Sequence, residues 1–232
     1  MPEVRKKRYY LLRAVIALCL FAVLLIAVTH VDVREIGPDG APVGLAAVNS
    51  AFRGIMTYGT EGVNTVLLKI RQYVRYALLI LALIEFIWAV RKLSNGRRRE
   101  NADLKALIFF LVLTMILCLV FTRFLMIVPK PVMTGGKLAP GFPSCFTLLA
   151  VCILSPAASE FSSNGKGRIF PAFFEMLVTL LLAALVILDL IAGVHWLTDV
   201  IGGLLLGRGI VLIWKHIASR STGRKDCVCE EE

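Results

Sequence analysis

Charged residues are scarce in this sequence: they make up 18 % of the 232 residues, whereas hydrophobic residues make up 58 %. The mean hydropathy is +0.78. So few polar groups could not cover the surface of a water-soluble protein of this length. The composition therefore excludes an ordinary soluble domain and indicates one membrane domain that spans residues 1–232.

Other common signals are absent as well. The sequence has no internal repeat, no low-complexity tract and no small-residue cleavage site after the first apolar run. We therefore expect that run to be retained as a helix rather than removed as a signal peptide. The net charge is +10, but no basic face carries base-stacking groups, which argues against a nucleic-acid partner.

Apolar runs are the main feature that is present. A spanning helix needs about 20 predominantly apolar residues. The six runs that approach this length cover residues 11–28, 74–90, 106–128, 143–156, 170–192 and 194–214. The fourth is short for a span unless its flanks extend it, and we interpret 31–43 as an aqueous loop and 43–74 as containing interfacial helix. The predicted fold class is all-α, a polytopic bundle of about six transmembrane helices.

Lysine and arginine indicate how these spans are oriented, because short loops rich in them stay on the cytoplasmic side. They gather in the amino terminus, in residues 91–105, around Lys166 and Arg168, and in a tail at 216–232. In a six-span arrangement all four segments fall on one side. We expect an integral protein of a bacterial cytoplasmic (plasma) membrane, with both termini cytoplasmic.

The six cysteines give little information about function. Four lie within or beside predicted spans, where a free thiol behaves as a small hydrophobe. Cys227 and Cys229 lie in the tail, where a reducing cytoplasm disfavours a disulfide. Two thiols alone would make a weak metal site, and acylation is another alternative. We interpret the pair as an incidental part of the tail.

Ionisable residues inside spans are costly and therefore direct attention to function. Glu85 and Glu175 support no mechanism, because each could pair with a neighbouring helix or reach the interface. A different pattern emerges at the outer ends of the third to sixth spans. The polar residues expected at that common depth are Arg123, Lys130, Ser144, Asp189, His195 and Asp199.

His195 and Asp199 are four residues apart, so on one helix they share a face. The carboxylate can then accept the imidazole Nδ1 proton and leave Nε2 as a nucleophile or base. An isolated pair of this kind is more often a packing contact between helices than a catalytic dyad. The neighbouring motifs favour the catalytic interpretation.

Three segments, taken in order, resemble the signature of the type 2 phosphatidic acid phosphatase (PAP2) superfamily. They are Arg123-x6-Lys130-Pro131, then Pro143-Ser144-Cys145-Phe146-Thr147, then Gly193-Val194-His195-x3-Asp199 followed by Gly202-Gly203. The signature region spans 123–203. This superfamily includes membrane lipid-phosphate phosphatases and soluble vanadium haloperoxidases. The resemblance implies neither a metal ion nor a cofactor for this branch.

By this resemblance His195 is the nucleophile that takes the phosphoryl group, and Asp199 is the carboxylate that orients it. Arg123 and Lys130 correspond to two phosphate-binding cations with their identities exchanged. Ser144 corresponds to a phosphate-binding serine. Attack by a neutral imidazole gives a phosphohistidine, and a fixed acceptor stabilises the positive charge that develops on the ring.

Four positions depart from the family pattern. Phe146 replaces the histidine that protonates the leaving oxygen, and Cys145 replaces a glycine. Leu188 and Asp189 replace a serine and a phosphate-clamping arginine. We expect the buried Asp189 to pair with Lys130 or Arg123 and to oppose a substrate phosphate, which would impair catalysis.

The predicted function is that of a lipid-phosphate phosphatase-like protein at the outer leaflet. It would act on, or bind, an amphiphilic phosphate such as a lipid phosphate or a polyprenyl (di)phosphate; if active, it is a hydrolase with a phosphohistidine intermediate. One alternative is a non-catalytic relative that binds lipid phosphates or partner proteins. A transporter using Glu85 and Asp189 has less support, because no inverted repeat is visible. Oligomeric state is not predicted.

Overall fold

The computed structural model describes residues 3–57, 65–95, 101–133, 136–164 and 169–226. Within these ranges the α-helices are α1 (Glu3–His30), α2 (Ala46–Met56), α3 (Thr65–Asn95), α4 (Asn101–Arg123), α5 (Cys145–Asn164), α6 (Ile169–Ile191) and α7 (Leu197–Asp226). A single 3-10 turn, η1, covers Pro38–Gly40. Strand pairing in the described ranges is limited to isolated bridges, such as Arg34 with Val43. The predicted all-α class is confirmed.

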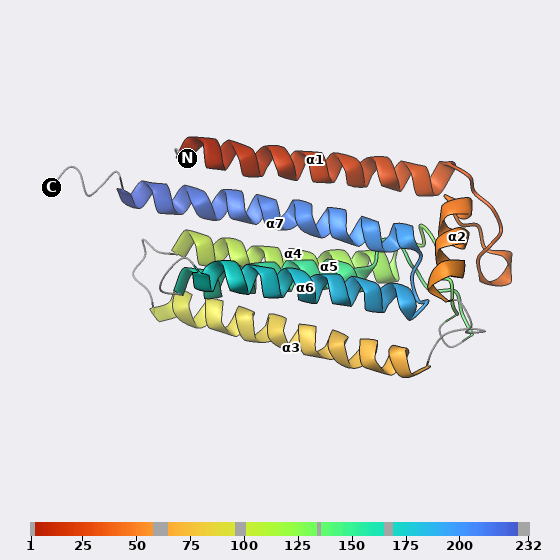
Figure 1. The fold of residues 1–232 in the computed structure, drawn as a ribbon. Helices are drawn as coiled ribbons and strands as arrows, with labels where there is room; N and C mark the ends of the chain where they lie inside the picture. Colours follow the sequence, from red (N-terminus) through yellow and green to blue (C-terminus); the bar gives the residue numbers. More distant parts are fainter. Residues whose placement is uncertain (1–2, 58–64, 96–100, 134–135, 165–168, 227–232) are drawn as a thin grey trace.

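The six long helices lie alongside one another, and α2 lies across one end of the bundle (Figure 1). Helix α5 packs against α4, α6 and α7, whereas α1 packs along α7. Both termini lie at the end opposite α2 (Figure 1). This arrangement brings the ends of helices that are distant in sequence to the same two faces.

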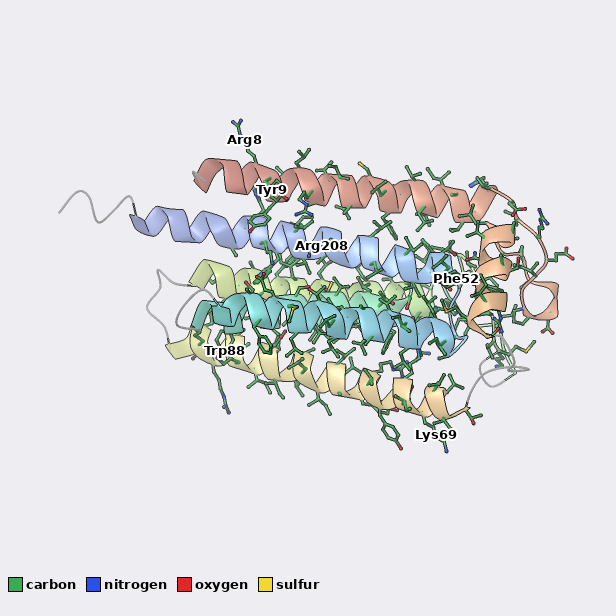
Figure 2. All side chains as sticks on the ribbon, in the orientation of Figure 1. Arg8, Tyr9, Phe52, Lys69, Trp88 and Arg208 are labelled. Carbon is green, nitrogen blue, oxygen red and sulfur yellow. The ribbon has the colours of Figure 1, made fainter. Side chains whose placement is uncertain are left out.

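The surface of the bundle is apolar, as a membrane protein requires. In the described residues, the helical segments long and apolar enough to span a bilayer are Arg8–His30, Thr65–Ser94, Leu104–Arg123 and Leu197–Ala218, and Cys145–Ser159 is a shorter apolar stretch. Large hydrophobic side chains such as Leu12 and Val23 are more than 60 % exposed. Figure 2 shows many side chains projecting outward from α1 and α3. The protein is an integral membrane protein, because water would not tolerate such a continuous apolar surface.

Several predicted boundaries were wrong. Helix α3 begins at Thr65, so the last part of the segment 43–74 belongs to a long helix and is not interfacial. Helix α4 ends at Arg123 rather than near residue 128. Helix α5 continues through Pro156 to Asn164, so flanking residues extend the short fourth run, and its apolar part covers Cys145–Ser159. In α3 the error has a physical cause: an arginine in its first part is paired across the bundle, so a polar residue there does not mark a loop.

Glycines allow α7 to lie close to α5. A Cβ atom on Gly203 would stand 2.6 Å from the carbonyl oxygen of Ser144, and one on Gly207 would stand 3.0 Å from Cβ of Val151. Small residues permit this close backbone approach. The contact fixes the start of α7 relative to the start of α5.

Some predicted features fall outside the described residues. These are Cys227 and Cys229, the Lys166 and Arg168 pair, and the basic run at 97–99. Helix α7 continues to Asp226, so the first part of the predicted tail is helical.

Candidate active site

Polar residues from four segments gather at the end of the bundle that carries α2. Ser144 immediately precedes α5, Asp189 lies near the end of α6, His195 precedes α7, and Asp199 lies in the first turn of α7. All four are buried. The sequence placed these residues at one membrane face, and in the structure they occupy one end of the bundle.

His195 and Asp199 are in contact. Nδ1 of His195 lies 3.3 Å from Oδ2 of Asp199, and the same oxygen accepts the backbone N–H of Trp196 at 3.0 Å. Asp199 is the third residue of α7, where an acidic side chain can reach back to the N-cap N–H and interact favourably with the helix dipole. Its carboxylate is therefore held in place, and the pair leaves Nε2 of His195 available.

Lys130 lies on the loop between α4 and α5, and this loop is tied to α7. The backbone N–H of Lys130 donates to the Ala139 oxygen at 2.8 Å, and that of Gly141 donates to the Val128 oxygen at 2.7 Å. Nε1 of Trp196 donates to the carbonyl of Pro129 at 2.9 Å. Burial, reinforced by the charge of Arg71, lowers the pKa of Lys130 below its ordinary value.

A cavity of about 370 Å³ opens beside these residues. Its polar lining includes four groups that bind or attack anions: Arg71, Arg75, Lys130 and His195. Its apolar lining includes Leu79, Met115, Leu119, Phe121 and Leu149. The cavity is thus lined by both cationic and apolar side chains, which is the combination that an amphiphilic anion requires.

Asp189 does not pair as predicted. Its Oδ1 accepts a hydrogen bond from Nε of Arg71 at 2.5 Å, and its Oδ2 accepts one from Oγ of Ser144 at 2.7 Å. The predicted partners, Lys130 and Arg123, were wrong. The expectation that a buried acid must be paired was right, because an isolated charge in the interior is very unfavourable.

Three other positions noted in the sequence resemblance, Phe146, Cys145 and Leu188, lie in different surroundings. Phe146 is buried, and Cζ of Arg71 lies 4.8 Å from the centre of its ring. Cys145 lines the cavity, and its Sγ lies 3.7 Å from the carbonyl oxygen of Cys118. Leu188 is half-buried and does not line the cavity.

The two predicted phosphate-binding cations lie in different places. Lys130 lines the cavity, but Arg123 is exposed at the end of α4 and is not part of the lining. Ser144 is fully buried, and its hydroxyl donates a hydrogen bond to Asp189. Glu85 and Glu175 also lie away from the cavity lining.

Arg71 and Arg75 were missed by the sequence analysis. They lie one turn apart on α3 and both line the cavity. Two arginines at this spacing, directly before an apolar run, put two like charges on one helix face, which is unfavourable without an anionic partner. That spacing was the signal that could have found them.

Comparison with known proteins identifies the fold. No protein-family model matches the sequence, and a comparison with curated proteins gives no match. The crystal structure of a transmembrane PAP2-type phosphatidylglycerolphosphate phosphatase from Bacillus subtilis matches at a TM-score of 0.60, covering 88 % of this chain and 94 % of that one. The chain has the fold of a PAP2-type membrane phosphatase. Aquifex aeolicus LpxE matches at a TM-score of 0.36 and 17 % identity, covering 71 % of this chain and 94 % of its own.

The PAP2-type fold is present although only 18 % of the residues are identical to the Bacillus protein.

Proposed function

We propose that the protein binds an amphiphilic phosphate in the cavity and transfers its phosphoryl group to His195. The observation that carries the proposal is the buried His195–Asp199 pair, of which His195 lines a cavity that Lys130 and two arginines also line. The PAP2-type fold supports it, and the Bacillus protein with this fold is a phosphatase of a lipid phosphate.

In the proposed reaction Nε2 of His195 forms a bond to phosphorus, the bond from phosphorus to the oxygen of the lipid breaks, and the electron pair leaves with that oxygen. Nδ1–H donates to Oδ2 of Asp199, and the carboxylate stabilises the positive charge that grows on the ring. Lys130 and the arginines hold the non-bridging oxygens as charge develops on them. Water then hydrolyses the phosphohistidine and releases inorganic phosphate.

The apolar wall accounts for the lipid part of the ligand. Leu79 belongs to α3, and Met115 and Leu119 belong to α4; all three line the cavity. Leu119 is 58 % exposed on the outer surface of the bundle. An alkyl chain that extends from the cationic residues along Leu119 would therefore reach the surrounding lipid. We place this cavity at the outer leaflet, with both termini cytoplasmic.

A second candidate is a binding protein without turnover. It is favoured by one observation: the hydroxyl of Ser144 donates to Asp189 and not into the cavity. Such a protein would bind the same ligands, and His195 would have no role in releasing phosphate.

The test is phosphate release by the purified protein in detergent micelles, across a panel of lipid phosphates and diphosphates, with binding measured in parallel. His195→Ala should abolish release and leave binding largely intact, and Asp199→Asn should reduce release strongly. Binding with no His195-dependent release on any substrate would support the second candidate. Absence of binding by the parent protein would reject both.

A further inference from the structure

A second cavity lies at the end of the bundle that α2 crosses, and it is separate from the cavity that His195 lines. Its volume is about 700 Å³, and we call it the Arg53 cavity. Its lining comes from η1 and the residue pair before it, from α2 and the residue after it, from residues 131–133 and from Trp196. Helix α2 and η1 lie outside the apolar segments that are long enough to span a bilayer. The Arg53 cavity is therefore at the aqueous end of the bundle (Figure 1).

Arg53 is the one charged side chain that lines this cavity within the described part of the chain. Its Cζ lies 5.3 Å from the centre of the Trp196 ring, within the range of a cation–π contact. Its Nη1 is buried and has no hydrogen-bond partner among the residues that the structure describes. Burial lowers the pKa of Arg53, because the charged form is less well hydrated there. The guanidinium is thus a partly dehydrated cation, and no described acidic side chain in the lining offsets its charge.

Consecutive residues line the two cavities. Lys130 and His195 line one of them, whereas the residues that follow, Pro131 and Trp196, line the Arg53 cavity. The two segments are also joined, because Nε1 of Trp196 donates to the carbonyl oxygen of Pro129 at 2.9 Å. The cavities are therefore neighbours, and at these two points the backbone of adjacent residues divides them.

The proposed reaction gives two products that must leave in different directions. The dephosphorylated lipid has an apolar chain, and Leu119 extends the lining of the His195 cavity to the exposed surface of α4. Inorganic phosphate is an anion, and an unpaired anion in an apolar medium is very unfavourable. It has to leave toward water, and the Arg53 cavity lies next to the His195 cavity on the aqueous side.

We propose that the Arg53 cavity is a second anion site, which holds inorganic phosphate after its release and before it reaches the water. The oxyanion accepts charge-assisted hydrogen bonds from the part of the guanidinium that is not buried against Trp196. The role in release rests on the proposed function. The binding of phosphate at Arg53 does not, because it depends on the residues of this cavity alone.

The binding test uses the His195→Ala variant in detergent micelles, saturated with dodecyl phosphate so that the His195 cavity is filled and no phosphate is produced. Radiolabelled inorganic phosphate should still bind. Adding Arg53→Gln should weaken this binding by about tenfold or more, because the charge-assisted hydrogen bonds are lost. Arg53→Lys keeps the charge and should retain part of the binding. Thermal unfolding of each variant reports whether the fold is kept.

Lys137→Gln is the matched control. Lys137 is an exposed cation on the loop between α4 and α5, and it lines neither cavity. Its replacement should leave phosphate binding unchanged. Equal weakening by Lys137→Gln and Arg53→Gln would assign the effect to the general positive charge of this face and overturn the inference.

The outcomes separate the inference from the proposed function. Phosphate binding that Arg53→Gln does not change, or that dodecyl phosphate abolishes, would overturn the inference and leave the proposed function intact. If dodecyl phosphate itself does not bind, the proposed function fails. The phosphate titration without dodecyl phosphate then decides the inference, through its dependence on Arg53.

Turnover gives a second measurement. Added inorganic phosphate should lower kcat of the parent protein, because an anion in the Arg53 cavity delays release without occupying the His195 cavity. In Arg53→Gln the fall in kcat should disappear, whereas the competition with lipid phosphate, seen as a rise in KM, should remain. Purely competitive inhibition of the parent protein would overturn the role in release.

Discussion

Arg71 on α3 and Asp189 on α6 are 118 residues apart in sequence and form a buried ion pair, with Nε 2.5 Å from Oδ1. The side chain of Arg71 is 9 % exposed and that of Asp189 is fully buried. The pair joins two helices at the end of the bundle where His195 lies. The negative charge of Asp189 also offsets part of the positive charge that Arg71 brings to the cavity.

Removing one member of this pair should destabilise the protein strongly. Arg71→Leu leaves the Asp189 carboxylate buried without its cation, for which we expect a loss of about 3–5 kcal/mol in the free energy of unfolding. Arg71→Leu with Asp189→Asn should lose less. Thermal unfolding in detergent measures both, and Lys69→Leu is the exposed control. A double variant no more stable than the single one would contradict the pairing.

The lowered pKa of Lys130 predicts a pH dependence of ligand binding. Burial, with Arg71 opposing and Asp189 favouring the charge, puts this pKa below the ordinary value of 10.5. As pH rises through the lowered pKa, Lys130 loses its charge while an ordinary lysine would keep it. Affinity for dodecyl phosphate should therefore fall at alkaline pH. Lys130→Arg should remove this fall, because arginine stays charged; the same fall in that variant would assign it to another group.

Gly141 keeps the Lys130 loop close to the His195–Asp199 pair. A Cβ atom at this position would lie 2.8 Å from Oδ2 of Asp199 and 3.1 Å from the Lys130 nitrogen. Gly141→Ala should push the loop away, cost about 1–3 kcal/mol in stability, and reduce phosphate release at least tenfold. Gly54→Ala is the control, since nothing lies within 4 Å of a Cβ there. Equal effects of the two changes on phosphate release would contradict the steric argument.

Asn49 attaches α2 to the start of α7. Its Oδ1 accepts the backbone N–H of Thr198 at 3.2 Å, and its Nδ2 donates to the Gly44 oxygen at 2.9 Å. Asn49→Leu would leave the Thr198 N–H and the Gly44 oxygen without this side-chain partner. We therefore expect the free energy of unfolding to fall by about 1–3 kcal/mol. Ser50→Ala, at an exposed neighbouring position, should have little effect. Chemical or thermal unfolding that does not distinguish the two variants would argue against this attachment.

The arrangement of the termini leads to a topology test. Both termini lie at the end of the bundle opposite α2 (Figure 1), and basic residues favour the cytoplasmic side for them. Tags at either terminus should be protected in intact cells, whereas a tag at Asp39, in the turn η1, should be accessible. Protection at Asp39 with exposed termini would put the cavity on the cytoplasmic face.

Local rules predicted the helical framework well. The length of the apolar runs identified a membrane bundle, because a spanning helix must satisfy its backbone within an apolar stretch of about 20 residues. The predicted contact of His195 with Asp199 is present, but the two residues do not share a helix as predicted: His195 lies in the turn before α7, and Asp199 reaches back to it from the first turn of α7. The predicted PAP2-type fold is confirmed by the match to the Bacillus structure. Boundaries were less accurate where polar residues occur inside helices, as at the start of α3.

The partner of each buried charge was decided by the tertiary structure alone. The sequence required Asp189 to be paired but did not select Arg71 over Lys130 or Arg123, because the choice depends on which helices lie side by side at that depth. Burial then imposes the pairing, since an unpaired charge there is too unfavourable to persist. The same packing puts Arg71 over Phe146 and leaves Arg123 exposed. Spacing along one helix is local geometry, whereas the meeting of α3 and α6 follows from how the whole bundle packs.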